Sequence, residues 1–445
     1  RSYLVTMSTT PKSPSKSEFY INTHGVGSGI LGQDRSVPIS IQRKDVKILL
    51  LEGIHQNAVS LFESNGFTVT QTKSLAPEQL LEEVKDCHVI GVRSKTQLTK
   101  EVLANAKHLM AIGCFCIGTD QTDLKFAQAN GIPVFNAPYS NTRSVAELVI
   151  GHIVYLARKM GDRLMEMHRG EWRKTAVGCF EVRGKTIGIV GYGHVGSQVS
   201  LLAESMGMRV IAYDHQPKLM LGNATAVDSL DEVLTTADFV TLHVPLTDVT
   251  ENMISAPQLA KMKKGSYLLN LARGGCVDLD ALADAIKSGH IAGCSVDVFP
   301  VEPLADGPGF TTPLQGLPNV ILSPHIGGST QEAQAAIGTE VAGRLVSLLN
   351  HGATLGAVNF PELDIRPKRT GTRVMNIHQN VPGVLGHINS ILSKFNIEEQ
   401  VLGTSDHVGY LICRLAEPDV GDAVRDEIAM LPTSIRTRHI PNDHR

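Results

Sequence analysis

The chain has 445 residues, 42 % of them hydrophobic, and a formal net charge of −3. This length predicts two or three domains with a sizeable core. The near-neutral charge gives no reason to expect nucleic acid or an anionic membrane as a partner, and no apolar run approaches the ~20 residues that span a bilayer.

The first 45 residues are rich in Ser, Thr, Pro and Gly, so we expect 1–45 to be a disordered extension. A transit peptide stays open as an alternative, because the first acidic residue is Glu18, but the low arginine content favours a cytoplasmic protein. The seven cysteines are scattered, which is typical of reduced thiols, and we expect no metal site. Cys114 and Cys116 are interpreted as core residues, with a redox or metal role as the alternative.

From Val46 onward, apolar strands alternate with helical segments. The segments 46–53, 87–94 and 110–118 have the pattern of buried strands, and helices are expected between them. A long helix is predicted over 143–160, a second βαβ set over 185–322 and another helix over 330–350. This alternation predicts an α/β fold with parallel sheets.

Residues 361–372 are polar with Pro and Gly, which indicates a linker. The remaining segments read β-α-β-β-α-β, with one weakly marked strand near 396–404. That order predicts a small ferredoxin-like module.

The segment from Lys185 to Gly196 is the strongest single motif. It places Gly191, Gly193 and Gly196 between an apolar strand and a helix, which is the arrangement that receives a pyrophosphate at the helix N-terminus. The next strand ends at Asp214, which suits the ribose hydroxyls and would repel a 2′-phosphate. The motif therefore predicts NAD rather than NADP.

Three later strand ends carry charged side chains suited to redox catalysis. His325 has the pKa range of a proton donor or acceptor, Glu302 can orient it, and Arg273 can polarise a carbonyl group. Asp297 ends a further strand. Ligands bind at strand ends in open α/β sheets, so we expect these groups to meet there. Each of Arg273, Glu302 and His325 alone could instead be structural.

The stretches GYGHVG, NLARGG, DVFPVEP and SPHIGGST resemble the D-2-hydroxyacid dehydrogenases over roughly residues 46–350. CFCIGTDQTDL and FNAPYSNTRSVAELVIG resemble the branch of that family that oxidises 3-phosphoglycerate. The resemblance implies two Rossmann-like domains followed by a ferredoxin-like ACT regulatory domain. The implied ranges are a substrate-binding domain over 46–140 and 328–360, an NAD-binding domain over 141–327, a linker over 361–372 and the ACT domain over 373–445.

The resemblance also implies roles for single residues. Arg273, Glu302 and His325 would be catalytic. The implied NAD-binding residues are Gly191, Gly193, His194, Val195, Gly196, Asp214, Leu271, Ala272, Arg273, Asp297, His325, Gly327 and Gly328.

The implied substrate carries a carboxylate and a phosphate, so the site needs further cations. Arg93, Ser94 and Lys95 follow a predicted strand, and an arginine there can grip an oxyanion in a bidentate manner. Asn141 matches a substrate contact of the family, whereas Arg143 could equally form a structural pair. We expect Arg93, Ser94, Lys95, Asn141 and Arg273 to bind 3-phosphoglycerate.

Two further implications concern assembly and regulation. Trp172 occupies a position that reaches a neighbouring subunit in the family, which implies a homotetramer. The stretch IHQNVPGVLGHI resembles the effector segment of an ACT domain, which implies L-serine as effector at His378 and Asn380, with Asn396 from the neighbouring module. Some serine-inhibited relatives have arginine where this chain has Val381, so the inhibition expected here is weak.

Other functions stay open on the sequence alone. A different 2-hydroxyacid dehydrogenase, such as a 2-oxoglutarate reductase, would use the same cations. A non-enzymatic NAD-sensing protein on this fold would keep the Arg, Glu and His.

Overall fold

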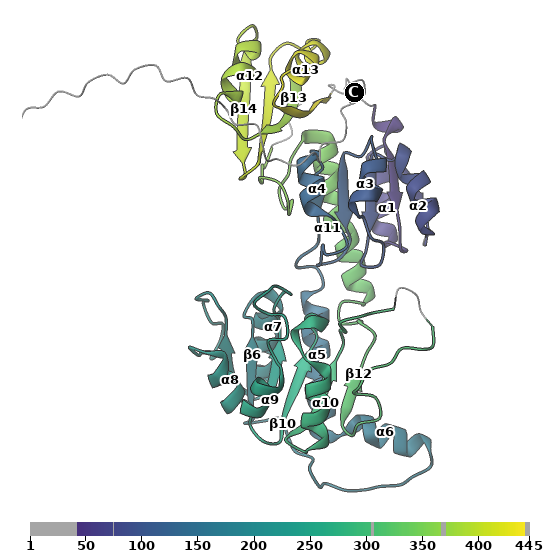
Figure 1. Cartoon of the computed structure of the whole chain (residues 1–445), viewed down its shortest axis with the longest axis vertical. Coiled ribbons are helices and arrows are strands. Elements are labelled where there is room, and N and C mark those ends of the chain that lie inside the picture. Colours follow the sequence, from purple (N-terminus) through teal and green to yellow (C-terminus); the bar gives the residue numbers. More distant parts are fainter. Residues whose placement is uncertain (1–41, 74, 304–306, 366–370, 441–445) are drawn as a thin grey trace, which may run out of the picture.

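The computed structural model describes residues 42–73, 75–303, 307–365 and 371–440. Two parallel sheets and one antiparallel sheet follow one another along the long axis of the molecule (Figure 1). The α/β fold class expected from the sequence is confirmed. Within the described residues, no helix is long and apolar enough to cross a membrane.

The first domain is built on a five-stranded parallel sheet of order β2-β1-β3-β4-β5. Its central strands are buried on both faces, which explains their continuous apolar runs. The elements are β1 Lys47–Leu50, α1 Gln56–Ser64, β2 Thr68–Gln71, α2 Pro77–Glu83, β3 Val89–Val92, α3 Lys100–Asn105, β4 Ala111–Cys114, α4 Leu124–Ala129 and β5 Val134–Phe135.

Helix α11, Gln331–His351, returns to this first domain from far along the chain. Its apolar face packs in one core with β1 and α1, where Val341 and Leu345 are fully buried. The helix begins at Thr330, whose hydroxyl accepts from the Ala333 N–H, and ends at Gly352 in the left-handed conformation. The first domain is therefore made of two separate stretches of sequence.

The inserted domain contains a seven-stranded parallel sheet of order β12-β11-β10-β9-β6-β7-β8. The strand order reverses between β6 and β9, and that switch point is where such sheets bind nucleotides. The elements are α5 Thr142–Arg158, α6 Met160–His168, β6 Thr186–Val190, α7 His194–Ser205, β7 Arg209–Tyr213, β8 Thr225–Ala226, α8 Leu230–Thr236, β9 Phe239–Leu242, α9 Ala256–Lys261, β10 Ser266–Asn270, α10 Leu279–Lys287, β11 Ile291–Val296 and β12 Val320–Leu322.

The C-terminal module is a four-stranded antiparallel sheet of order β14-β15-β13-β16 with two helices. The weakly marked strand is present as β14, in which side-chain exposure alternates along the strand. The elements are β13 Thr372–Gln379, α12 Val384–Leu392, β14 Ile397–Thr404, β15 Val408–Leu415, α13 Gly421–Ala429 and β16 Ser434–Ile440.

Some boundaries differ from those expected. The helix predicted over 143–160 ends at Arg158, because Lys159 has φ 51° and a new helix starts after it. The predicted linker over 361–372 includes the buried side chains of Leu363 and Ile365, which are 7 % and 4 % exposed. These two side chains join the core of the first domain to that of the module. The extension predicted over 1–45 lies outside the described residues up to 41, and Arg43–Asp45 form one 3-10 turn.

Candidate active site

In the glycine loop between β6 and α7, two glycines approach neighbouring backbone closely and the third borders open space. Gly191 has φ +94°, and a Cβ there would lie 2.5 Å from the carbonyl oxygen of His243 on the neighbouring strand end. A Cβ on Gly196 would lie 2.2 Å from the Gly191 oxygen, whereas a Cβ on Gly193 would meet no atom within 4 Å. The loop thus leaves open space at the N-terminus of α7, which fits a pyrophosphate.

Asp214 follows β7 beside this loop. One carboxylate oxygen accepts from the Tyr192 N–H at 2.9 Å, and the other accepts from the Gln216 N–H at 3.0 Å. These two bonds fix the carboxylate next to the loop. The oxygen that accepts from Gln216 also lies 3.2 Å from Nδ1 of His215, and the oxygen that accepts from Tyr192 keeps a second lone pair for a ribose hydroxyl. The residues present therefore fit NAD.

Arg273 is presented by a tight turn after β10. The fully buried Asn270 shapes this turn, since its side-chain N–H donates to the Arg273 carbonyl at 3.0 Å and its oxygen accepts from the Ala272 N–H at 3.1 Å. A Cβ on Gly274 would lie 2.0 Å from the Phe299 carbonyl carbon. The missing side chain lets the Arg273 turn approach the segment that leads to Glu302.

Glu302 and His325 form a hydrogen-bonded pair. Nδ1 of His325 lies 2.8 Å from one oxygen of Glu302, whose other oxygen accepts from the Phe299 N–H at 3.0 Å. The bond to Glu302 raises the pKa of His325 against the opposing effect of burial. Burial would raise the pKa of Glu302, but its hydrogen bonds with His325 and Phe299 outweigh this and lower it. The pair therefore favours an imidazolium beside a carboxylate, with Nε2 of His325 left for proton transfer.

Asp297 fixes the loop that carries His325. Its side chain is buried and accepts from the Ser323 hydroxyl at 2.6 Å and from the N–H groups of Ile326 at 3.0 Å and Gly327 at 2.8 Å. The backbone of His325 has φ 55°, which is uncommon for a residue other than glycine. The three hydrogen bonds that this one carboxylate accepts are a physical reason for the strained backbone to persist.

The opposite wall of the cleft comes from the first domain. Arg93 is half-buried after β3, and Ser94 and Lys95 are exposed beyond it. The Glu52 carboxylate holds this loop, because its two oxygens accept from the N–H groups of Lys95 at 3.1 Å and Thr96 at 2.8 Å. Glu52 has φ 62°, so a second strained residue lies at this site.

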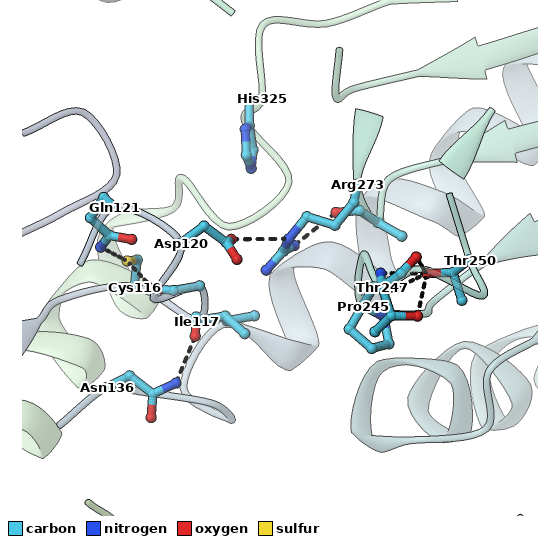
Figure 2. Close-up of polar contacts among 12 residues, drawn as sticks. Cys116, Ile117, Asp120, Gln121, Asn136, Pro245, Thr247, Thr250, Arg273 and His325 are labelled. Atoms are coloured by element: carbon cyan, nitrogen blue, oxygen red, sulfur yellow. Dashed lines mark hydrogen bonds and ion pairs between the residues drawn. The ribbon is translucent and has the colours of Figure 1, made fainter. Parts of the chain in front are cut away.

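The two walls meet at Arg273, as Figure 2 shows. Nε of Arg273 lies 3.9 Å from the carboxylate of Asp120, which belongs to the first domain, and His325 points into the same space. Cys116 lies beneath them: burial raises the pKa of its thiol to about 11, while the charges of Arg273 and Arg93 act in the opposite direction. The Cys116 thiol lies 3.4 Å from the Arg93 carbonyl, and a Cβ on the nearby Gly118 would lie 3.2 Å from Nη2 of Arg273. The loop 116–118 therefore contacts both Arg93 and Arg273.

Asn141 lies at the crossing between the two domains. A Cβ on Gly328 would lie 2.3 Å from its side-chain nitrogen, so Asn141 packs against the turn that follows His325. Arg143 forms an exposed ion pair with Glu147 at 2.6 Å, in agreement with its structural alternative.

The other predicted cofactor residues surround the same strand ends. His194 is the first residue of α7 and its ring lies 3.9 Å from that of Tyr139, which comes from the other side of the crossing. Leu271 and Ala272 are buried after β10. Val195 and Gly328 are half-buried, and Gly327 is buried.

The predicted effector residues lie far from this cleft, on the C-terminal module. His378 is only 3 % exposed and its Nδ1 lies 3.0 Å from the side-chain oxygen of Asn376. Asn380 is exposed and donates to the Ser405 carbonyl at 2.7 Å. Asn396 is exposed just before β14.

Sequence reasoning missed four residues of the site: Glu52, Asp120, His243 and Asn270. Glu52 and His243 each follow a buried strand. Because ligand sites lie at strand ends, this place in the sequence could have indicated both as site residues. Burial lowers the pKa of His243 to about 3, so this side chain is neutral, and its carbonyl packs on Gly191. The described residues contain no group of three His, Cys, Asp or Glu side chains placed to hold a metal ion.

Comparison with known proteins agrees with this geometry. Residues 150–327 match the family described as D-isomer specific 2-hydroxyacid dehydrogenase, NAD binding domain. D-3-phosphoglycerate dehydrogenase of Dictyostelium discoideum is 50 % identical over 400 residues, covering 90 % of this chain and 98 % of the relative. D-3-phosphoglycerate dehydrogenase 1 of Saccharomyces cerevisiae is 52 % identical over 391 residues, covering 85 % and 83 %.

A solved structure gives the same result for the fold. D-lactate dehydrogenase of Aquifex aeolicus, in complex with NAD and lactic acid, aligns with a TM-score of 0.63 at 27 % identity and covers 71 % of this chain and 100 % of its own. The chain belongs to the D-isomer specific 2-hydroxyacid dehydrogenases. Within that family, its place is among the D-3-phosphoglycerate dehydrogenases.

Proposed function

We propose that the chain catalyses the NAD-dependent oxidation of 3-phospho-D-glycerate to 3-phosphohydroxypyruvate, the first step of phosphorylated L-serine synthesis. The observation that carries this proposal is the 2.8 Å pair of Glu302 and His325. The imidazole of His325 points toward the space beside Arg273 (Figure 2). The two relatives named D-3-phosphoglycerate dehydrogenase, which are 50 % and 52 % identical to this chain, support the choice of substrate.

The chain's own groups divide the work of the reaction. Nε2 of His325 takes the proton of the substrate hydroxyl, and Glu302 stabilises the imidazolium that forms. Arg273 donates to the oxygen that becomes the carbonyl and to the adjacent carboxylate. The glycine loop and Asp214 would hold NAD, which when bound would supply the acceptor for the hydride of the substrate carbon that carries the hydroxyl.

The phosphate of the substrate requires cations beyond Arg273. Arg93 supplies a guanidinium fork and Lys95 a point charge, on the wall opposite the nucleotide domain. Glu52 acts as a positioning residue, since its carboxylate fixes the backbone of Lys95 and Thr96. Substrate bound between the two walls would draw them together and exclude water from the reacting carbon.

The test is NADH formation from 3-phosphoglycerate, with phosphoserine transaminase present to remove the product. Turnover that exceeds turnover on 2-hydroxyglutarate supports the proposal. A chain that turns over only 2-hydroxyglutarate is a reductase of 2-oxoglutarate, and a chain that turns over neither but binds NADH is a nucleotide sensor.

We further propose that L-serine inhibits this activity by binding at the turn after β13. The exposed amide of Asn380 supports this site, with His378 beside it and Asn396 supplied by a second module. Val381 is 46 % exposed at the same turn and offers no charge to a carboxylate. Weak inhibition follows from that difference.

We propose a homotetramer as the working assembly. Trp172 is 81 % exposed, and Met165 and Val177, which lie near it in sequence, are 64 % and 80 % exposed. Such a group of exposed apolar side chains is typical of an interface. Light scattering should give four times the chain mass of 48.0 kDa, and Trp172→Arg should lower it. An unchanged mass would remove this surface as the interface.

We also propose a cytoplasmic location. All seven cysteines are free, as expected for reduced surroundings. Fractionation of cells that express the full chain would test this.

A further inference from the structure

Asp120 faces the guanidinium of Arg273 from the other side of the domain boundary. Its Oδ2 lies 3.9 Å from Nε of Arg273, and Figure 2 shows the carboxylate pointing from the first domain toward that side chain. A Cβ on Gly118 would lie 3.1 Å from the same oxygen and 3.2 Å from Nη2 of Arg273. Because Gly118 has no side chain, the carboxylate and the guanidinium face each other directly.

The loop that carries Asp120 is fixed by side chains of the first domain. The side-chain N–H of Asn136 donates to the Ile117 carbonyl at 2.6 Å. On the other side of Asp120, the buried side chain of Gln121 donates to the Arg93 carbonyl. The first domain therefore sets the position of Asp120, independently of its partner across the boundary.

The pair of Asp120 and Arg273 is a contact between charges, because 3.9 Å is too long for a hydrogen bond. Nη1 of Arg273 donates to the Ala272 carbonyl at 2.8 Å, and this is the guanidinium's only hydrogen bond among the residues that the structure describes. Most of its five N–H donors are thus available to a ligand, and a negative charge already lies beside them.

The two side chains of the pair differ in exposure. Arg273 is 29 % exposed and Asp120 is 85 % exposed, so the pair itself adds little to the stability of the fold. The charge of Asp120 acts mainly on an anion that arrives at Arg273, because like charges repel over a screening length of about 10 Å at 0.1 M salt. Arg93 and Lys95, on the same wall of the cleft, act on that anion in the opposite direction.

We propose that Asp120 is a specificity-determining residue that lowers the affinity of the cleft for anionic substrates, because it competes with the substrate carboxylate for Arg273. This inference rests on the function proposed above, in which Arg273 binds that carboxylate. When substrate binds, Arg273 exchanges one carboxylate for another. Asp120 is then left beside a ligand that carries both a carboxylate and a phosphate, and the repulsion between them raises KM.

The test is Asp120→Asn in the full chain, which removes the charge and keeps the size of the side chain. KM for 3-phosphoglycerate should fall about 1.5–5-fold at low salt, the range expected for an exposed ion pair. Kd for 3-phosphoglycerate, measured by calorimetry with NADH present to prevent turnover, should fall equally, and NADH binding should not change. The difference should be largest near 0.01 M salt and vanish near 1 M, where the screening length is about 3 Å.

Two further variants serve as controls. Asp120→Glu keeps the charge and should resemble the unmodified chain. Asp284→Asn removes an equally exposed charge on α10, far from Arg273 in sequence, and should leave KM unchanged. The side chain of Asp284 is 81 % exposed and pairs with Lys287 at 3.3 Å.

The outcomes separate this inference from the proposed function. Equal KM and Kd in the unmodified chain and Asp120→Asn at low salt would overturn the inference and leave the function standing. A raised KM, or a change that is the same at all salt concentrations, would also overturn it and would make Asp120 a residue that holds Arg273 in place. An unmodified chain that neither binds nor oxidises 3-phosphoglycerate would overturn the function and the inference together.

Discussion

The catalytic cleft and the effector segment are built in different ways. In the cleft, buried or anchored carboxylates hold the loops that carry charged groups: Asp297 accepts from the backbone of the His325 loop, and Glu52 accepts from that of the Lys95 loop. In the effector segment, Asn380 is exposed at a turn, while His378 is buried and bonded to Asn376. The groups that would react meet within one chain, whereas those that would regulate leave a surface to be completed by another module.

The largest effect is expected when the proposed proton carrier of the cleft, His325, is removed. His325→Ala should lower kcat by about 10²–10⁴-fold, the usual contribution of general acid–base catalysis. NADH binding, followed by fluorescence, should stay near the wild-type value, since the glycine loop is untouched. His168→Ala, an exposed histidine on α6, is the control. A variant at position 325 that keeps more than a tenth of the rate would exclude His325 as the proton carrier.

The second-largest effect is expected for Arg93, the cation proposed to bind the phosphate of the substrate. A hydrogen bond to a charged group is worth about 1.5–3 kcal/mol, so Arg93→Ala should raise KM for 3-phosphoglycerate about 10–100-fold. Small unphosphorylated 2-oxo acids should be reduced as before. Arg143→Ala removes an arginine that pairs with Glu147 and should change neither value. Equal losses on both substrate types would refute the phosphate role of Arg93.

The Glu302–His325 pair predicts a pH effect whose sign is fixed. The pKa of His325 is raised by Glu302, so oxidation, which needs neutral imidazole, should rise with pH through this raised pKa. Glu302→Gln should move that limb to lower pH. It should also slow reduction at neutral pH by about 10–100-fold, because the imidazolium is lost with its charged partner. pH profiles in both directions measure this, and an unmoved limb would show that Glu302 does not set the pKa.

The smallest effect on turnover is expected at the effector turn. Asn380→Ala should leave the rate without serine unchanged and abolish serine inhibition. Asn389→Ala on α12 of the same module is the control. Inhibition that persists in the Asn380 variant would move the effector site elsewhere.

The fold was predictable where patterns are local. Continuous apolar runs identified the central strands of both parallel sheets, because these are buried on both faces. The C-terminal strand β14 was weakly marked because it lies at the edge of its sheet, with five of its eight residues exposed and the other three half-buried. Leu363 and Ile365 were assigned to a linker because the sequence around them is polar and contains Pro. Their burial depends on contacts with residues distant in sequence, which a local pattern does not show.

The site residues were likewise predictable where the signal is local in sequence, and not where it depends on distant contacts. Arg273, Glu302 and His325 could be found because each follows a strand within a motif of its own. Glu52 also follows a buried strand, but the sequence could not show what it holds, because Lys95 and Thr96 lie 43 and 44 residues away. Asp120 could not be found, because Arg273 lies across a domain boundary. The sequence also suggested that Asp297 faces the cofactor, and could not reveal that its oxygens hold the catalytic loop.

The return of α11 to the first domain has a consequence for synthesis of the chain. The core around Ile48 and Leu50 is closed by Val341 and Leu345, which are translated roughly 300 residues later. At about 5–20 residues per second, the ribosome needs about 15–60 s to cover that distance. During this interval the first sheet lacks the helix that covers one of its faces. The inserted domain has all its strands once residue 322 is made, before α11 is translated. The nascent first domain is therefore the part of this chain most in need of a chaperone.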